Sequence, residues 1–131
     1  VQNTNDMEMF RGLDYSVSRA VQADRIVHLQ GQTGIPLNGK GFIGEGTPAA
    51  QAENAMQCVK ILLEEAGSKM EDIVKITTFV TSVADWNAHA NAPALFEEYF
   101  KGEYPTNSLV EIRALAEKGL DVEIEAIAIL D

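Results

Sequence analysis

The clearest periodic pattern along the chain is a run of apolar residues at three- and four-residue spacing between positions 48 and 66. These apolar residues are Ala52, Met56, Val59, Leu63 and Ala66, while Glu53, Gln57, Lys60 and Glu64 lie on the other side. Such a stripe is typical of an amphipathic helix. We expect the helix to begin at Thr47, whose side chain can accept a hydrogen bond from a free backbone N–H, with Pro48 in the first turn. Gly67 would end it in a left-handed conformation.

Other segments carry the β-branched and apolar residues that are typical of strands. Residues 17–22 and 25–30 flank a two-residue turn and predict a β-hairpin. Residues 73–80 have β-branched side chains at both odd and even positions, so we expect this strand to lie inside the sheet with both faces covered. Residues 108–113 and 121–130 are the last two predicted strands.

The remaining segments complete the predicted order of elements. Residues 31–46 are rich in glycine, which predicts a long surface loop. Because Pro93 cannot lie deep inside a helix, we expect a short turn at 85–89 and then a helix that begins at Asn91 and runs over 92–100. The resulting order predicts a single α+β domain over residues 1–131, a mixed β-sheet with two helices packed on one face.

The other face of that sheet is expected to be apolar as well. In the last strand, Ile124, Ala126 and Ala128 alternate with a second set of residues that ends in Ile127 and Ile129. Apolar side chains would therefore remain on the face that no helix covers. A large uncovered apolar face indicates that the chain associates with other chains.

Charge and composition argue against several classes of partner. The chain has 20 acidic and 10 basic side chains and a formal net charge of −10, which would repel a phosphate backbone. No apolar run approaches the roughly 20 residues of a membrane-spanning helix. We therefore expect a cytoplasmic protein that binds neither nucleic acid nor membrane. His28 and His89 have no second ligand at metal-binding spacing, and Cys58 is expected to be a small buried apolar residue, so no metal site is predicted.

Two segments near the end of the chain resemble a known family. Residues 122–128 read Val-Glu-Ile-Glu-Ala-Ile-Ala, and residues 105–112 read Pro-Thr-Asn-Ser-Leu-Val-Glu-Ile. They resemble the YjgF/RidA family of small trimeric imine/enamine deaminases, some of which are labelled endoribonuclease L-PSP. In that family the two segments usually read Val-Glu-Ile-Glu-Ala-Ile-Ala and Pro-Ala-Arg-Ser-x-Val-Glu-Val. Residues 30–33 and 65–80 resemble further family segments, and the resemblance extends over about residues 17–130.

The resemblance implies a chorismate mutase-like YjgF fold that assembles as a homotrimer with a ligand cleft at each subunit interface. It implies that Glu123 positions the water that hydrolyses the imine. It also implies that the loop at Gln30 and Gly31 contacts a small-molecule ligand through its backbone. No metal or organic cofactor is implied.

One position departs from the family pattern. Asn107 stands where the family has an arginine that pairs with the substrate carboxylate. Asparagine has neither the positive charge of arginine nor the guanidinium group that donates two parallel hydrogen bonds to a carboxylate. We therefore expect imines of the 2-iminobutyrate type to be poor substrates. Arg19 or Arg25 of an adjacent subunit could replace the missing arginine. Arg113 would lie about 20 Å further along the strand, and we expect it to pair with Glu111 or with solvent.

Each candidate residue also has a purely structural explanation. Glu123 and Glu125 share a face of the last strand, and two nearby carboxylates raise at least one pKa, which suits a general acid or base. Alternatively, Glu125 forms a salt bridge with Lys75 or Arg113, and Glu123 faces water.

The residues around the missing arginine are open to the same two explanations. Asn107 and Ser108 could hold a neutral polar ligand, or they could simply form a turn-to-strand junction. Tyr104 could stack on a planar ligand or line the subunit interface. Gly31 permits a tight bend or a close backbone approach to a ligand.

We therefore expect a homotrimer that binds a small molecule and hydrolyses an imine, an enamine or a related C–N bond. That activity would make it a hydrolase of the deaminase type. The alternative is a non-catalytic protein that binds or senses a small metabolite on the same trimeric scaffold, and the missing arginine motivates it. A third hypothesis is RNA cleavage, which the negative charge disfavours.

Overall fold

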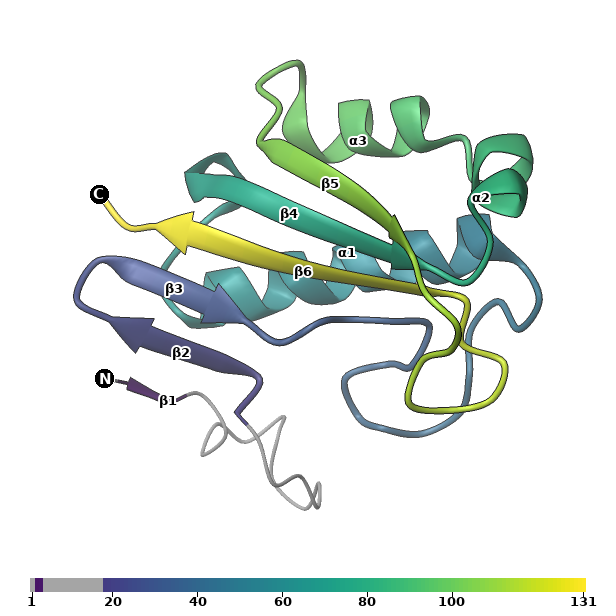
Figure 1. The fold of residues 1–131 in the computed structure, drawn as a ribbon. Coiled ribbons are helices and arrows are strands. Elements are labelled where there is room, and N and C mark those ends of the chain that lie inside the picture. The colour runs from purple at the N-terminus through teal and green to yellow at the C-terminus, as the bar shows by residue number, and fades with distance from the viewer. Residues whose placement is uncertain (1, 4–17) are drawn as a thin grey trace.

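In a computed structural model, which describes residues 2–3 and 18–131, the chain forms a mixed six-stranded sheet with helices on one face (Figure 1). The strands are ordered β1-β2-β3-β6-β4-β5 across the sheet. Their bounds are β1 Gln2–Asn3, β2 Ala20–Ala23, β3 Ile26–Leu29, β4 Ile73–Val80, β5 Thr106–Glu111 and β6 Val122–Ile129. Neighbouring strands run antiparallel except β4 and β5, which run parallel. The predicted α+β class is confirmed.

The helices are α1 (Pro48–Glu65), the 3-10 helix η2 (Met70–Asp72), α2 (Val83–His89) and α3 (Ala92–Phe100). In Figure 1, α1 crosses behind the sheet, with β6 and β4 in front of it. The predicted apolar stripe of α1 is buried, and Ala52, Met56, Val59 and Leu63 are each 0% exposed. They form one core with alternate residues of β6 that point toward the helix.

The second helical region differs from the prediction of one turn and one helix. Residues 83–89 form a full helix, α2, because the Ser82 side chain caps it and accepts a hydrogen bond from the Asp85 N–H at 3.1 Å. The part of the chain that the structure describes therefore has three α-helices, not two. Asn91 precedes α3 and Pro93 lies in its first turn, both as predicted.

The ends of α1 were predicted correctly, although one of the proposed reasons was wrong. The helix begins after Thr47, but the Thr47 side chain accepts no capping hydrogen bond. Pro48 occupies the first turn as expected, and Gly67 adopts the predicted left-handed conformation, with a φ of 81°.

The other strands lie close to their predicted ranges. The hairpin turns at Asp24, which has a φ of 57°, and its strands are shorter than predicted. Val17, the predicted start of the first strand, lies outside the described residues. β5 begins two residues earlier than expected and ends at Glu111, so Arg113 is not part of the strand.

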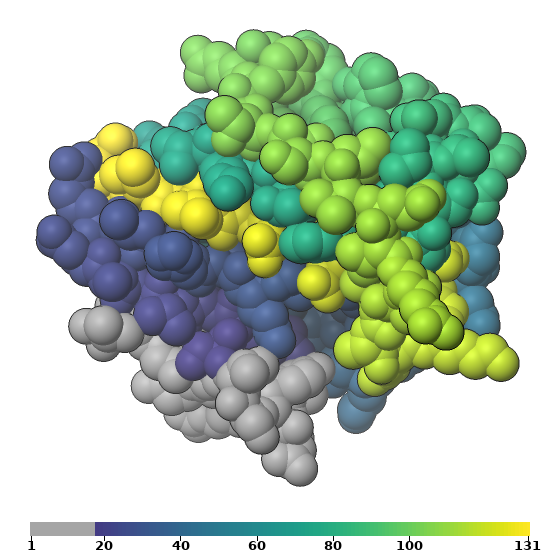
Figure 2. All heavy atoms as spheres, in the orientation of Figure 1, coloured from purple at the N-terminus to yellow at the C-terminus, as the bar shows by residue number. Residues whose placement is uncertain are grey.

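The face of the sheet opposite α1 carries no helix, and Figure 2 shows atoms of β3, β6, β4 and β5 at the surface of this face. Apolar side chains are exposed there. Ile26 and Ile129, which pair across β3 and β6, are 41% and 39% exposed, and Val110 on β5 is 38% exposed. The expectation that both faces of β4 are covered is therefore wrong for one chain, because Ile73, Ile76, Thr78 and Val80 are buried but Val74 is 45% exposed. We call this face the open face.

Candidate active site

Glu123 lines a cavity of about 160 Å³ that is built from four segments of the chain, one of which contributes Arg19. Residues 30–36, which follow β3, form one wall, and the 116–120 loop forms another. Figure 1 shows these two loops side by side at one end of the sheet. Glu123 enters from β6 on the open face, because Val122 and Ile124 on either side of it are buried against the helices.

Gly31 lies directly against the Glu123 side chain. A Cβ atom built on Gly31 would lie 2.5 Å from both Cδ and Oε2 of Glu123. Only glycine leaves room for the carboxylate in this position, so the close approach that Gly31 permits in this structure is that of the Glu123 side chain.

The loop that carries Gly31 is held in place by hydrogen bonds. The backbone N–H of Gln32 donates to the Ile124 carbonyl at 2.8 Å, and the Ile124 N–H donates to the Gln32 carbonyl at 2.9 Å. The Gln32 side chain, which is buried, also donates to the Gln30 carbonyl at 3.0 Å. Gln30 and Gly31 are therefore fixed beside Glu123, and the predicted contact of this loop with a ligand stays a prediction.

Burial raises the pKa of the Glu123 carboxyl, and the negative charge of Glu125 raises it further. Glu125 itself is exposed. Its predicted salt bridge with Lys75 or Arg113 is not observed, since the ion pair found among the described residues joins Lys69 to Asp131 at 3.6 Å. Glu123 is thus a half-buried carboxyl group that favours its protonated form more than ordinary glutamate does.

The three candidate replacement arginines lie in different places. Arg19 is 5% exposed and lines the Glu123 cavity. Arg25 is exposed, and its Nε donates to the Leu130 carbonyl at 2.9 Å. This hydrogen bond holds the Arg25 side chain beside the residue that follows β6. Arg113 is exposed and lies beyond the end of β5. Of the three, Arg19 is the one that shares a cavity with Glu123.

Asn107 and Glu123 point to opposite faces of the sheet within one chain. Asn107 is aligned with the buried Ile76 on β4, so it lies on the face that carries the helices. Glu123 is aligned with Phe79, three positions further along β4, so it lies on the open face. Ser108 is on the open face but does not line the Glu123 cavity. A single chain therefore does not bring Asn107 or Ser108 into the pocket that contains Glu123.

Asn107 and Tyr104 instead line a second cavity of about 230 Å³ between α3 and β5. The other lining residues are Ile76, Pro93, Phe96, Phe100 and Pro105. The Tyr104 hydroxyl donates to a carboxylate oxygen of Glu97, which ties the segment before β5 to α3. Sequence reasoning did not link Phe96 and Phe100 to a ligand, because aromatic residues four apart on a helix are also the ordinary signal of a core.

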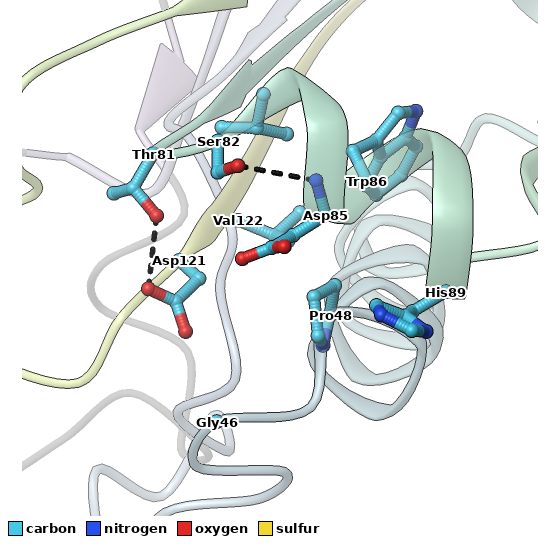
Figure 3. Close-up of a pocket in the computed structure, with 10 residues that line it drawn as sticks. Gly46, Pro48, Thr81, Ser82, Asp85, Trp86, His89, Asp121 and Val122 are labelled. Atoms are coloured by element: carbon cyan, nitrogen blue, oxygen red, sulfur yellow. Dashed lines mark hydrogen bonds between the residues drawn. The ribbon is translucent and has the colours of Figure 1, made fainter.

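A third cavity, of about 260 Å³, lies where α2 meets the start of α1 (Figure 3). Its polar groups are engaged in local structure: Thr81 Oγ1 donates to Asp121 Oδ1 at 2.9 Å, and the Ser82 side chain caps α2. His89 and Asp85 also line it. No group of His, Cys, Asp or Glu side chains that could hold a metal occurs among the described residues.

The buried side chain of Gln51 organises the approach to β6 and was not identified from the sequence. Its Oε1 accepts hydrogen bonds from the Asp121 and Val122 N–H groups at 2.8 and 3.3 Å. Its Nε2 donates to the carbonyls of Gly44 and Gly119 at 3.0 and 3.2 Å. Gln51 thereby connects α1 to the loop that contains Gly44 and to the loop that contains Gly119, which leads into β6.

Cys58 has the structural role that was predicted. It is 3% exposed, and burial raises the pKa of its thiol above the ordinary value. None of the helices in the described part of the chain is long and apolar enough to cross a bilayer.

Comparison with known proteins gives a consistent match over most of the chain. A model of the endoribonuclease L-PSP family matches residues 13–130. The human 2-iminobutanoate/2-iminopropanoate deaminase is 32% identical, over 86% of this chain and 78% of the human protein.

Two solved structures resemble the fold. A putative endoribonuclease from Thermotoga maritima has a TM-score of 0.79 and 29% identity, and the match covers 89% of this chain and 88% of that chain. A Mycobacterium tuberculosis protein described as a member of the YjgF/YER057c/UK114 family has a TM-score of 0.72 and 32% identity, over 87% of this chain and 86% of that chain.

Proposed function

Because the chain belongs to the endoribonuclease L-PSP family, which includes the YjgF and RidA proteins, we propose that it is a cytoplasmic hydrolase acting on the C–N bond of an imine or enamine. The observation that supports this activity best is the half-buried Glu123 carboxyl, with a raised pKa, in a cavity against Gly31. The similarity to a human deaminase supports the reaction class.

Glu123 performs the proton transfers of this reaction. Its carboxylate accepts a proton from water as the water oxygen bonds to the imine carbon. It then returns the proton to nitrogen, which gives a carbinolamine. In a second transfer the carboxylate takes the proton of the new hydroxyl group and delivers it to nitrogen, the C–N bond breaks, and ammonia leaves behind a carbonyl group. A carboxyl group whose pKa is raised toward neutrality serves both steps better than an ordinary glutamate.

The complete site belongs to a homotrimer in this proposal. The exposed apolar residues of the open face, with Ile26, Val110 and Ile129 among them, give a second chain a surface to cover. Glu123 and Gly31 come from one subunit, while Asn107, Ser108 and Tyr104 come from its neighbour. This division accommodates the opposite directions in which Glu123 and Asn107 point.

The substrate differs from 2-iminobutyrate in this account, because Asn107 replaces the carboxylate-binding arginine of the family. Losing a charge-assisted pair of that kind weakens binding by about 2 kcal/mol. Imines of simple amino acids are therefore turned over slowly, unless Arg19 of the Glu123 cavity binds their carboxylate instead.

The test compares Glu123→Gln with the matched control Glu125→Gln, two residues away on the same face of β6. Imines are generated in situ by an amino-acid oxidase from 2-aminobutyrate, leucine and phenylalanine, and their decay is followed with and without the protein. Glu123→Gln should lower the rate by about 100-fold or more, the contribution of a positioned acid or base. Glu125→Gln should stay within about threefold of the wild type at pH 8, because the exposed Glu125 acts only through its charge.

Equal rates for Glu123→Gln and the wild type would refute the role of Glu123. No turnover of any imine, together with a small molecule that raises the melting temperature, would favour the non-catalytic binding protein, which the missing arginine motivates. RNA cleavage would require RNA binding that weakens with salt, and the net charge of −10 opposes it.

A further inference from the structure

The cavity between α3 and β5 has walls that suit a flat ring. Phe96 and Phe100 have ring centroids 6.0 Å apart and planes inclined at 41°, so they form an angled aromatic wall. Pro93 and Pro105 also line the cavity, and the buried side chain of Ile76 contributes an apolar surface from β4. Apolar and aromatic walls with few polar groups are characteristic of small-molecule sites.

Asn107 offers this cavity a hydrogen-bond donor. Its Oδ1 accepts a hydrogen bond from Thr78 Oγ1 at 3.0 Å, and Thr78 is 0% exposed. The buried threonine therefore fixes the amide oxygen and leaves the amide nitrogen as the free end. That nitrogen has no hydrogen-bond partner among the residues that the structure describes, and because Asn107 is exposed it is accessible to an acceptor atom of a ligand.

The charges around the cavity select against an anion. Among the residues that the structure describes, no lysine or arginine lines it, and the carboxylate of Glu97 lies at its edge, where it accepts a hydrogen bond from the Tyr104 hydroxyl. A carboxylate placed here would lose its hydration without gaining a cation. A neutral acceptor such as an amide or ketone oxygen would need only the single donor that Asn107 provides.

We propose that this cavity binds an uncharged planar ring carrying a hydrogen-bond acceptor, with the Asn107 amide nitrogen as donor and Phe96 and Phe100 as the ring's walls. The inference rests on the proposed function in one respect: the ring belongs to the molecule whose C–N bond Glu123 of a neighbouring subunit hydrolyses. It extends that function by assigning the substrate class.

The test uses three probes that separate the ring from the acceptor and from its charge. Benzamide has the ring and a neutral acceptor, benzoate has the ring and a charge, and acetamide has the acceptor without the ring. Each is titrated into the ¹⁵N-labelled wild-type protein while the side-chain amide signal of Asn107 is followed by NMR. Benzamide should shift that signal and saturate, and benzoate and acetamide should bind at least about fivefold more weakly, the loss expected for one missing hydrogen bond or ring contact.

Variants of the cavity give the second arm of the experiment. Asn107→Asp keeps the acceptor for Thr78 but replaces the donor with a negative charge, and it should weaken benzamide binding by about tenfold. Phe96→Ala removes half of the aromatic wall from a partly exposed position and should weaken it by at least about threefold. The matched control Asn87→Asp, on the exposed surface of α2, should bind benzamide like the wild type.

Benzoate binding as tightly as benzamide, or Asn107→Asp binding benzamide like the wild type, would overturn the inference. The measurement involves no turnover, so its outcome is independent of the imine assay. Selective benzamide binding without any imine hydrolysis would contradict the proposed hydrolysis alone. Hydrolysis that depends on Glu123, without selective benzamide binding, would contradict the ring site alone.

Discussion

The contact between Gly31 and Glu123 makes a single methyl group a sensitive test of the active-site geometry. In Gly31→Ala the new Cβ would lie 2.5 Å from Cδ and Oε2 of Glu123 and 2.6 Å from its Cγ. Gly31 is not one of the glycines with a left-handed φ, so alanine adds no backbone strain. The change therefore acts on the position of the carboxylate.

The size of the displacement follows from these distances. Ordinary van der Waals contact begins at 3.4 Å, so the carboxylate must withdraw by the difference from 2.5 Å, about 0.9 Å. A misplacement of about 1 Å can reduce catalysis by about 100-fold. The stability cost should be only about 1 kcal/mol, the cost of moving a flexible side chain away from its preferred rotamer.

The assay measures kcat/KM for an imine that the wild-type protein hydrolyses, together with the melting temperature. Glu123→Asp supplies the control, because the shorter side chain leaves room for the new methyl group. Glu123→Asp should therefore cost less activity in the Gly31→Ala background than in the wild type, which is a non-additive result. If Gly31→Ala kept more than about half of the wild-type kcat/KM, the position of the carboxylate would not control the reaction.

Two further predictions concern stability. The raised pKa of Glu123 means that the folded state holds a proton that the unfolded state releases, so this contribution to stability is present below the ordinary glutamate value of 4.5 and is lost as pH rises. Glu123→Gln should therefore melt at a higher temperature than the wild type at pH 8, and the difference should shrink as pH falls below 4.5; a difference independent of pH would contradict the burial argument. Gln51→Leu leaves the N–H groups of Asp121 and Val122 without their acceptor and should reduce the free energy of unfolding by about 3 kcal/mol in urea denaturation. The exposed Gln57→Leu on the same helix should cost less than about 1 kcal/mol, and equal losses would show that Gln51 does not brace the loop.

The sequence predicted those elements whose signals are local. β4 covers the predicted range of residues 73–80, because its β-branched residues favour a strand whichever neighbour it pairs with. The start of α1 at Pro48 was also local information. α2 was expected to be only a turn because the prediction considered Pro93 and overlooked Ser82, whose side chain caps the helix.

In the candidate site too, features with a local sequence signal were predicted and features that depend on tertiary packing were not. The resemblance to a family named both Glu123 and Gly31 as candidate site residues, but the contact between them was not predicted, because it depends on how the 30–36 loop packs against β6. The direction in which the Asn107 side chain points was not predicted, because it depends on the register that aligns Asn107 of β5 with Ile76 of β4. Strand register is set by tertiary pairing, and a shift of one residue would have turned Asn107 to the other face. The aromatic cavity likewise forms only once α3 docks beside β5.

The central claim is that each active site takes Glu123 from one subunit and Asn107 from its neighbour, and mixed trimers test it most directly. Glu123→Gln and Asn107→Asp chains with different affinity tags are co-expressed, and assemblies that contain both are purified. If the site is shared between neighbours, one of the three clefts in each mixed trimer receives both wild-type residues, and imine hydrolysis recovers to about a third of the wild-type rate. If hydrolysis in the mixed assemblies stayed at the level of the two parent variants, the site would lie within one chain and the account would be wrong.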